Sequence, residues 1–244
     1  IKILNTKYDD KVKILQKSKK SPKIAIGNKL SLKISKLSFS YSNSFKIFKN
    51  LNLSFKSGDF AILMGESDLG KTTLIQLFLC FLKPLNGKIL FNGNEIFKNI
   101  SEWYSLIGYV PKNNIILNDQ IRRNIAFGCK ENEIDNKRIN YVLKKVELYE
   151  FIYKRKKNIF EVINPRSTNF SGGQLQRLAI ARALYFKPRV LIMDEPTNSL
   201  DSNSEESIFK MLKKLNNIDI KIVVSHGTNL KKYCNKIINL NKDA

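Results

Sequence analysis

The sequence is poor in long hydrophobic runs and in cysteine, and each shortage excludes a class of protein. Its longest nearly unbroken apolar run, around Leu74 to Leu82, is far shorter than the roughly 20 residues that a membrane-spanning helix needs. The three cysteines, Cys80, Cys129 and Cys234, are far apart and match no spacing typical of a metal site or a redox pair. We therefore expect a soluble piece of protein in a reducing compartment.

Acidic residues are also scarce, with 21 Asp and Glu against 43 Lys and Arg, which gives a formal net charge of +22. Such a balance can mark a protein that binds nucleic acid or an anionic membrane. Here lysine is spread along nearly the whole chain together with abundant asparagine and isoleucine, as an AT-rich coding bias would produce. We therefore do not expect nucleic acid as a partner.

The chain divides at about residue 30. Residues 1–29 have scattered charge, a break at Pro22 and little periodicity, so we interpret them as a linker, and residues 30–244 as one domain. Residues 60–64 form an unbroken apolar run, which is typical of a parallel strand buried on both faces. Further strands are expected over 87–91, 190–193 and 221–225, and helices over 74–82, 174–186 and 204–215.

The alternation of strands and helices predicts an α/β fold with a mainly parallel sheet. Two features lie outside that alternation. Short alternating segments between residues 30 and 55 predict an N-terminal antiparallel β subdomain. Apolar residues at helical spacing within a polar stretch predict an inserted helical subdomain at about residues 113–183.

A phosphate-binding motif follows the buried strand 60–64 and precedes a helix. Residues 65–72 match the pattern GxxxxGK[ST] in the structural context that the pattern requires. The backbone N–H groups of such a loop and the start of the following helix face an anion. Lys71 is expected to reach the β- and γ-phosphates, and the Thr72 hydroxyl to bind Mg²⁺. The expected nucleotide contacts of the loop are Gly65, Glu66, Ser67, Asp68, Leu69, Gly70, Lys71, Thr72 and Thr73.

Three further segments resemble motifs of the ATP-binding cassette (ABC) transporter family, in the family's order. Residues 170–177, FSGGQLQR, resemble its signature motif, and residues 190–195, VLIMDE, its Walker B strand. Residues 199–201 and His226 resemble the D-loop and the switch histidine. The resemblance runs from about Leu30 to the end of the chain, and it implies a P-loop NTPase with a RecA-like core that binds ATP and Mg²⁺.

The resemblance also implies roles for individual residues. Asp194 would hold Mg²⁺ together with Thr72, Glu195 would be the general base for the attacking water, and Lys71 and His226 would complete the catalytic set. Tyr41 resembles the aromatic residue that stacks on adenine. The remaining nucleotide contacts would be Ser171, Gly172, Gly173 and Gln174, offered to a second nucleotide-binding domain, and Asp201.

Two positions depart from the family's pattern. Lys112 stands where the family has the Q-loop glutamine, and an ammonium group cannot coordinate Mg²⁺. Asp68 stands where the phosphate loop usually has a third glycine. Both departures put the rate of hydrolysis and the affinity for nucleotide in doubt more than the fold.

Three functions remain open from the sequence. Residues 1–4 and 119–125 resemble exporter-type half-transporters, which implies a membrane domain before Ile1 on the same chain and a place at the cytoplasmic face of a membrane. The chain would then power export or flipping of a substrate. The first alternative is a soluble cassette ATPase that acts on ribosomes or DNA. The second is a degenerate nucleotide-binding half of a heterodimeric transporter, which Lys112 and Asp68 would explain.

Overall fold

The computed structural model describes residues 29–42, 45–66, 69–164 and 170–240. Its centre is a parallel sheet with the strand order β11-β3-β10-β9-β6. Every residue of β9 and β10 is buried, as are four of the five residues of β3, which is what the unbroken apolar runs predict. The strands of this sheet are β3 (Phe60–Met64), β6 (Ile107–Val110), β9 (Val190–Asp194), β10 (Ile220–Val224) and β11 (Lys236–Asn239).

A second sheet is antiparallel, with the order β2-β1-β4-β5, and a two-stranded ribbon pairs β7 with β8. The long strands β1 and β2 pair over most of their length, and β4 lies on the other side of β1. The segments between residues 30 and 56 thus form the antiparallel unit that the sequence predicts. These strands are β1 (Ser31–Ser42), β2 (Phe45–Lys56), β4 (Asn86–Phe91), β5 (Asn94–Glu95), β7 (Asp119–Gln120) and β8 (Val162–Ile163).

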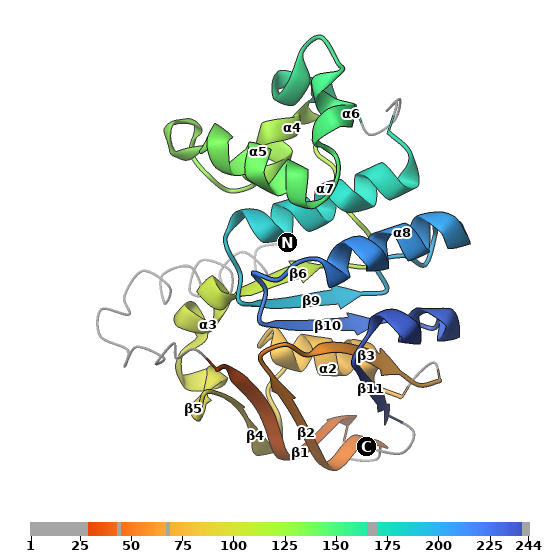
Figure 1. The fold of residues 1–244 in the computed structure, drawn as a ribbon. Helices are drawn as coiled ribbons and strands as arrows, with labels where there is room; N and C mark the ends of the chain where they lie inside the picture. The colour runs from red at the N-terminus through yellow and green to blue at the C-terminus, as the bar shows by residue number, and fades with distance from the viewer. Residues whose placement is uncertain (1–28, 43–44, 67–68, 165–169, 241–244) are drawn as a thin grey trace.

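Figure 1 shows the layers that these sheets make with the helices. Helix α2 lies between the two sheets, α7 and α8 lie along the opposite face of the parallel sheet, and α4 to α6 form a cap beyond α7. The fold class expected from the sequence is confirmed. The helices are α2 (Lys71–Phe78), α3 (Ile100–Leu106), α4 (Ile121–Ile125), α5 (Asn136–Lys145), α6 (Tyr149–Tyr153), α7 (Gly172–Tyr185) and α8 (Ser202–Lys213).

Alternate residues of the central strands supply two separate cores. In β9, Leu191 and Met193 pack with the helices on the α7 side, whereas Val190 and Ile192 pack with α2 and the antiparallel sheet. Successive side chains of a strand point to opposite faces, so one apolar run serves both layers. This arrangement holds the carboxyl ends of β3, β9 and β10 side by side at one edge of the sheet.

Helix α2 ends four residues earlier than the expected end at Leu82. Its last residue is Phe78, whose carbonyl accepts a hydrogen bond from the buried indole N–H of Trp103 at 2.7 Å. Cys80 then takes a left-handed backbone conformation with φ 55°, which stops the helix. Beyond the helix the apolar run continues with Leu79, which is buried, and with Cys80 and Leu82, which pack against the core, so apolar content alone misplaced the end.

Candidate functional site

The phosphate-loop motif predicted at residues 65–72 lies between β3 and the first turn of α2. Its residue just before α2, Gly70, has φ 83°, and a Cβ atom built there would lie 2.4 Å from Ile47 Cγ2 and 2.7 Å from Phe48 Cζ. Only glycine fits this position, because both the backbone angle and the space exclude a side chain. Two predicted contacts of the loop, Ser67 and Asp68, lie outside the described residues.

Lys71 is a buried side chain at the start of α2. Its ammonium donates to the carbonyl oxygens of Gly65 at 2.8 Å and Glu66 at 2.6 Å, and so spans the loop. Thr72 beside it is exposed, whereas Thr73 is buried. Gly70 offers no side chain to cap α2, so the first N–H groups of the helix are available to an anion.

Asp194 and Glu195 lie where β9 ends. Asp194 is buried, and its Oδ1 atom has no hydrogen-bond partner in the described part of the chain. Burial, and next the charge of Glu195, raise the pKa of Asp194, although Lys112 and Lys71 oppose this. Glu195 has a left-handed backbone with φ 42°, an uncommon conformation for such a residue that is often found at functional sites.

The carboxylate of Glu195 is held from two sides. Its Oε2 atom lies 2.6 Å from Lys112 Nζ, and its Oε1 atom lies 3.3 Å from His226 Nε2. Burial alone would raise the pKa of Glu195, but the hydrogen bond and charge of Lys112, with the contact to His226, lower it overall. The hydrogen bond to Glu195 raises the pKa of Lys112. The sequence placed Lys112, Glu195 and His226 at one site but gave no sign that they contact one another.

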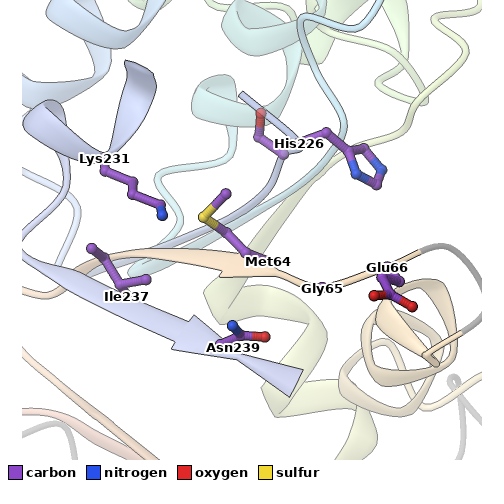
Figure 2. A pocket seen from close by; sticks show the side chains of 8 residues that line it. Met64, Gly65, Glu66, His226, Lys231, Ile237 and Asn239 are labelled. Carbon is purple, nitrogen blue, oxygen red and sulfur yellow. The ribbon is translucent and has the colours of Figure 1, made fainter. Parts of the chain in front are cut away.

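Figure 2 shows a pocket of about 370 Å³ beside the start of the phosphate loop. Gly65 and Glu66 border it on one side, and His226, from the end of β10, on another. Lys231 and Asn239 close the part that lies over β11. Gly65 and His226 therefore border one pocket, although they lie 161 positions apart in the sequence.

Tyr41 lies on the antiparallel sheet next to the first turns of α2. Its ring is 62% exposed, and its hydroxyl contacts Thr73 Oγ1 at 3.0 Å and Gln76 Oε1 at 3.3 Å. The ring also meets Phe39 edge to face at 5.0 Å between centroids. An exposed ring anchored at its hydroxyl leaves one aromatic face for stacking, so the adenine role stays a prediction that the geometry permits.

The signature segment forms the start of α7 and caps itself. Ser171 Oγ accepts from the Gln174 N–H at 3.3 Å, while the Gln174 side chain accepts from the Ser171 N–H at 2.9 Å. This reciprocal pair is a capping box. Ser171 and Gly172 are exposed, and Gly173 is partly exposed. Asp201 likewise caps α8, where it accepts from the Ser204 N–H at 2.9 Å.

Asn114, in the segment after Lys112, contacts α7 through its side-chain amide, and the sequence did not predict this contact. The Asn114 side chain donates to the buried side chain of Gln176 on α7. The two amides lie 62 positions apart, and no sequence pattern predicts a contact between them.

The residues at the ends of β9 and α2 fit a hard cation. The unpartnered carboxylate oxygen of Asp194 and the exposed hydroxyl of Thr72 are oxygen donors, which Mg²⁺ prefers. No group of three or more His, Cys, Asp or Glu that could hold a metal occurs in the described residues. A cation held here would depend on phosphate and water for its other ligands, as Mg²⁺ commonly does.

Comparison with known proteins shows which family this chain resembles. The family model described as "ABC transporter" matches residues 48–198. An export ATP-binding/permease protein of Rickettsia prowazekii is 36% identical over 200 residues, covering 81% of this chain and 34% of that protein. The leukotoxin translocation ATP-binding protein LktB of Mannheimia glucosida is 34% identical over 197 residues, covering 80% of this chain and 28% of that protein. The chain thus spans about a third of these relatives.

A solved structure shows the same fold. A bacterial Atm1-family ABC exporter with ATP bound superposes with a TM-score of 0.76 at 24% identity, covering 96% of this chain and 42% of that one. Within the described residues, no helix is long and apolar enough to span a bilayer. Because the family model matches more than half of the chain, the chain belongs to the ABC transporter family, of which it is an ATP-binding domain.

Proposed function

We propose that this chain hydrolyses MgATP as one half of a nucleotide-bound dimer and thereby powers export of a substrate across a membrane. The observation that carries the proposal is the convergence of Lys71, Asp194 and Glu195 at one edge of the parallel sheet, where Lys71 bonds to the carbonyls of Gly65 and Glu66. Ligands of open α/β sheets bind at the carboxyl ends of the strands.

Each residue has a chemical part in this reaction. Lys71 and the N–H groups of α2 bind the β- and γ-phosphates, and Tyr41 stacks on the adenine ring. Thr72 and Asp194 would hold Mg²⁺, which neutralises negative charge on the phosphates. Glu195 accepts a proton as water attacks the γ-phosphorus, and the bond to the bridging oxygen breaks to release ADP and phosphate. His226 orients the water and the γ-phosphate.

The second half of the site comes from a partner subunit. The start of α7 is exposed, and the polar groups of Ser171 and Gln174 hydrogen-bond to each other. The N–H groups of Ser171 and Gly173 at this positive helix end would bind the γ-phosphate held by the partner. Two copies related by a two-fold axis would complete two sites at once.

The export function rests on the relatives. Proteins named for export or translocation match four-fifths of this chain, and one is named an ATP-binding/permease protein. We infer that a membrane domain precedes Ile1 on the same polypeptide and that the domain works at the cytoplasmic face of the membrane. These names favour export over action on ribosomes or DNA.

The test is the oligomeric state of Glu195→Gln. This change removes the base but keeps the side chain's size, so hydrolysis stops and the ATP-bound dimer accumulates. Light scattering after size exclusion should give twice the monomer mass with MgATP and the monomer mass without it. Lys71→Met on the same background is the matched control and should stay monomeric. A Glu195→Gln chain that remains monomeric at saturating MgATP and high protein concentration would disprove the dimer.

A further inference from the structure

The contact between Lys112 and Glu195 joins a residue that departs from the family's pattern to the residue that matches the family's general base. Lys112 follows β6 and Pro111, and its ammonium lies 2.6 Å from Glu195 Oε2. The other oxygen of Glu195 faces His226. Both oxygens of the proposed general base are therefore engaged by side chains of the same chain.

The geometry differs from that of an ordinary surface ion pair. The Glu195 side chain is only 12% exposed, whereas that of Lys112 is 49% exposed. Glu195 is fixed by its place directly after β9 and by a backbone hydrogen bond from its N–H to the Val224 carbonyl at 3.1 Å. The backbone of the base is thus anchored and its side chain mostly buried, so the more exposed lysine is the partner with room to move. A long side chain with an exposed end can swing to a new anion without any change in the backbone.

The phosphate loop would place such an anion near this ion pair. The charges of Lys112 and of Lys71 in the loop motif both act on Asp194, the residue before Glu195. His226, which contacts Glu195, also lines the pocket of Figure 2 beside Glu66 of the loop. A terminal phosphate bound there carries more negative charge than one carboxylate and offers three oxygens to an ammonium. Once ATP is bound, the phosphate is therefore the stronger partner for Lys112.

We propose that Lys112 is a positioning residue that holds the Glu195 carboxylate in the nucleotide-free chain and transfers its ammonium to the γ-phosphate when ATP binds. The inference rests on the proposed function, because it takes Glu195 as the base. While Lys112 is on Glu195, one carboxylate oxygen is blocked and cannot accept a proton from water. After the transfer, the oxygen is free and the lysine contributes to nucleotide affinity instead.

This role differs from the simple loss of a metal ligand, and the two make different demands on position 112. A glutamine restores a neutral amide that can bind Mg²⁺, whereas a methionine removes the charge and supplies no oxygen. If Lys112 acts through its charge on Glu195, Lys112→Gln and Lys112→Met should behave alike. If the missing ligand is what matters, only Lys112→Gln should raise activity.

The first measurement is steady-state hydrolysis by the full 244-residue chain. Both neutral variants should raise KM for MgATP about two- to fivefold, which is the range that a partly exposed ion pair can change, and should leave kcat nearly unchanged, because Glu195 is already released in the ATP-bound chain. Lys112→Arg should keep values near those of the unchanged chain. Lys98→Met is the control, because Lys98 is an exposed lysine in an ion pair with Glu95 at 3.3 Å. A rise in kcat confined to Lys112→Gln, or no change in KM in either neutral variant, would overturn the proposal.

The second measurement needs no hydrolysis and therefore separates this inference from the proposed function. Thermal unfolding of Lys112→Met, Glu195→Gln and the double variant, without nucleotide, should show a non-additive change in Tm. Addition of ATP without Mg²⁺ should abolish the non-additivity, because the ammonium has left Glu195. Additive changes in the nucleotide-free chain would overturn the ion pair. An inactive unchanged chain that still shows the coupling would instead contradict the proposed function alone.

Discussion

The helices α2 and α7 both begin where a phosphate is expected, but their first turns are built in opposite ways. Helix α2 starts at Gly70, which supplies no cap, and Lys71 is buried against the loop carbonyls. Helix α7 starts at Ser171, where a capping box with Gln174 satisfies the first turn, and its glycines face solvent.

This difference indicates which of the two helix starts can bind an anion within one chain. An uncapped helix start with a lysine beside it is a complete anion site within one chain. A capped and exposed start needs no ligand for stability, so the monomer folds without one. We infer that α2 sets the affinity for nucleotide and that α7 sets association. If the roles of α2 and α7 are divided in this way, substitutions near each helix should change nucleotide affinity and association separately.

Lys71→Met should remove most of the nucleotide affinity that we assign to the start of α2. Two charge-assisted interactions with phosphate oxygens would be lost, at about 3 kcal/mol in total, which lowers affinity about a hundredfold. Titration calorimetry with ATP would measure it on the Glu195→Gln background. Thermal unfolding is needed beside it, because Lys71 also spans the loop. A folded variant whose affinity is within threefold of the original would contradict the role of Lys71.

Gly173→Asp should weaken the dimerisation that we assign to the start of α7 and leave nucleotide binding by the monomer unchanged. A Cβ at Gly173 would lie 3.6 Å from the nearest atoms, those of the Ser204 side chain, so it fits. An acidic group also suits a helix N-terminus. Opposite a partner's γ-phosphate at about 5 Å, however, the carboxylate would cost about 2 kcal/mol after screening, or about thirtyfold in association.

The readouts for Gly173→Asp are Tm, calorimetric ATP affinity of the monomer and the concentration dependence of hydrolysis. Tm and monomer affinity should be unchanged, while hydrolysis should need a much higher protein concentration. Gly173→Asn is the matched neutral control and should be milder. Equal dimerisation by the aspartate and asparagine variants would rule out a phosphate opposite α7.

Trp103→Phe should weaken the anchoring of α2 without touching its first turn. The indole N–H caps the Phe78 carbonyl at 2.7 Å, and the ring is fully buried against Phe91. Loss of this hydrogen bond and of ring volume should lower the free energy of unfolding by about 2 kcal/mol. Urea unfolding would measure the change, with Tyr104→Phe as a comparison that removes only the 2.7 Å bond to the Leu79 carbonyl. Stability equal to that of the unchanged chain would show that α2 has another anchor.

The sequence was most informative where local pattern and burial coincide. The apolar runs of β3, β9 and β10 predicted strands that differ from the observed ones by about a residue at each end. The short motif 65–72 predicted the turn into α2 because its glycines have a local backbone reason. The end of α2 was misplaced because the apolar run continues past Phe78, whereas the left-handed backbone of Cys80 stops the helix.

The site was less readable than the fold because its contacts join distant segments. Lys112 was noticed as a residue out of place, yet its partner Glu195 lies 83 residues away (195 − 112 = 83) and no periodicity links them. The family resemblance predicts that Gln174 and Asp201 contact nucleotide, and the structure shows in addition that both side chains cap their own helices, so the nucleotide contacts stay a prediction. A cap and a ligand contact use the same polar atoms, so sequence alone cannot separate them.

Asp68→Gly should strengthen nucleotide binding at the start of α2, by a smaller amount than the changes above. Asp68 lies outside the described residues, so the prediction depends on its place within the motif, between Gly65 and Gly70. A carboxylate at about 6 Å from a phosphate repels it by about 3 kcal/mol at an effective dielectric near 20, and Lys71 and Mg²⁺ should reduce this to about 1.4 kcal/mol. Its removal should then tighten MgATP binding about tenfold. Calorimetry on the Glu195→Gln background would measure the gain, with Asp68→Asn to separate charge from backbone freedom. If α2 sets nucleotide affinity, the dimer should form at proportionally lower MgATP but at the same protein concentration. Equal MgATP affinities with and without the change would mean that the Asp68 carboxylate points away from the phosphates.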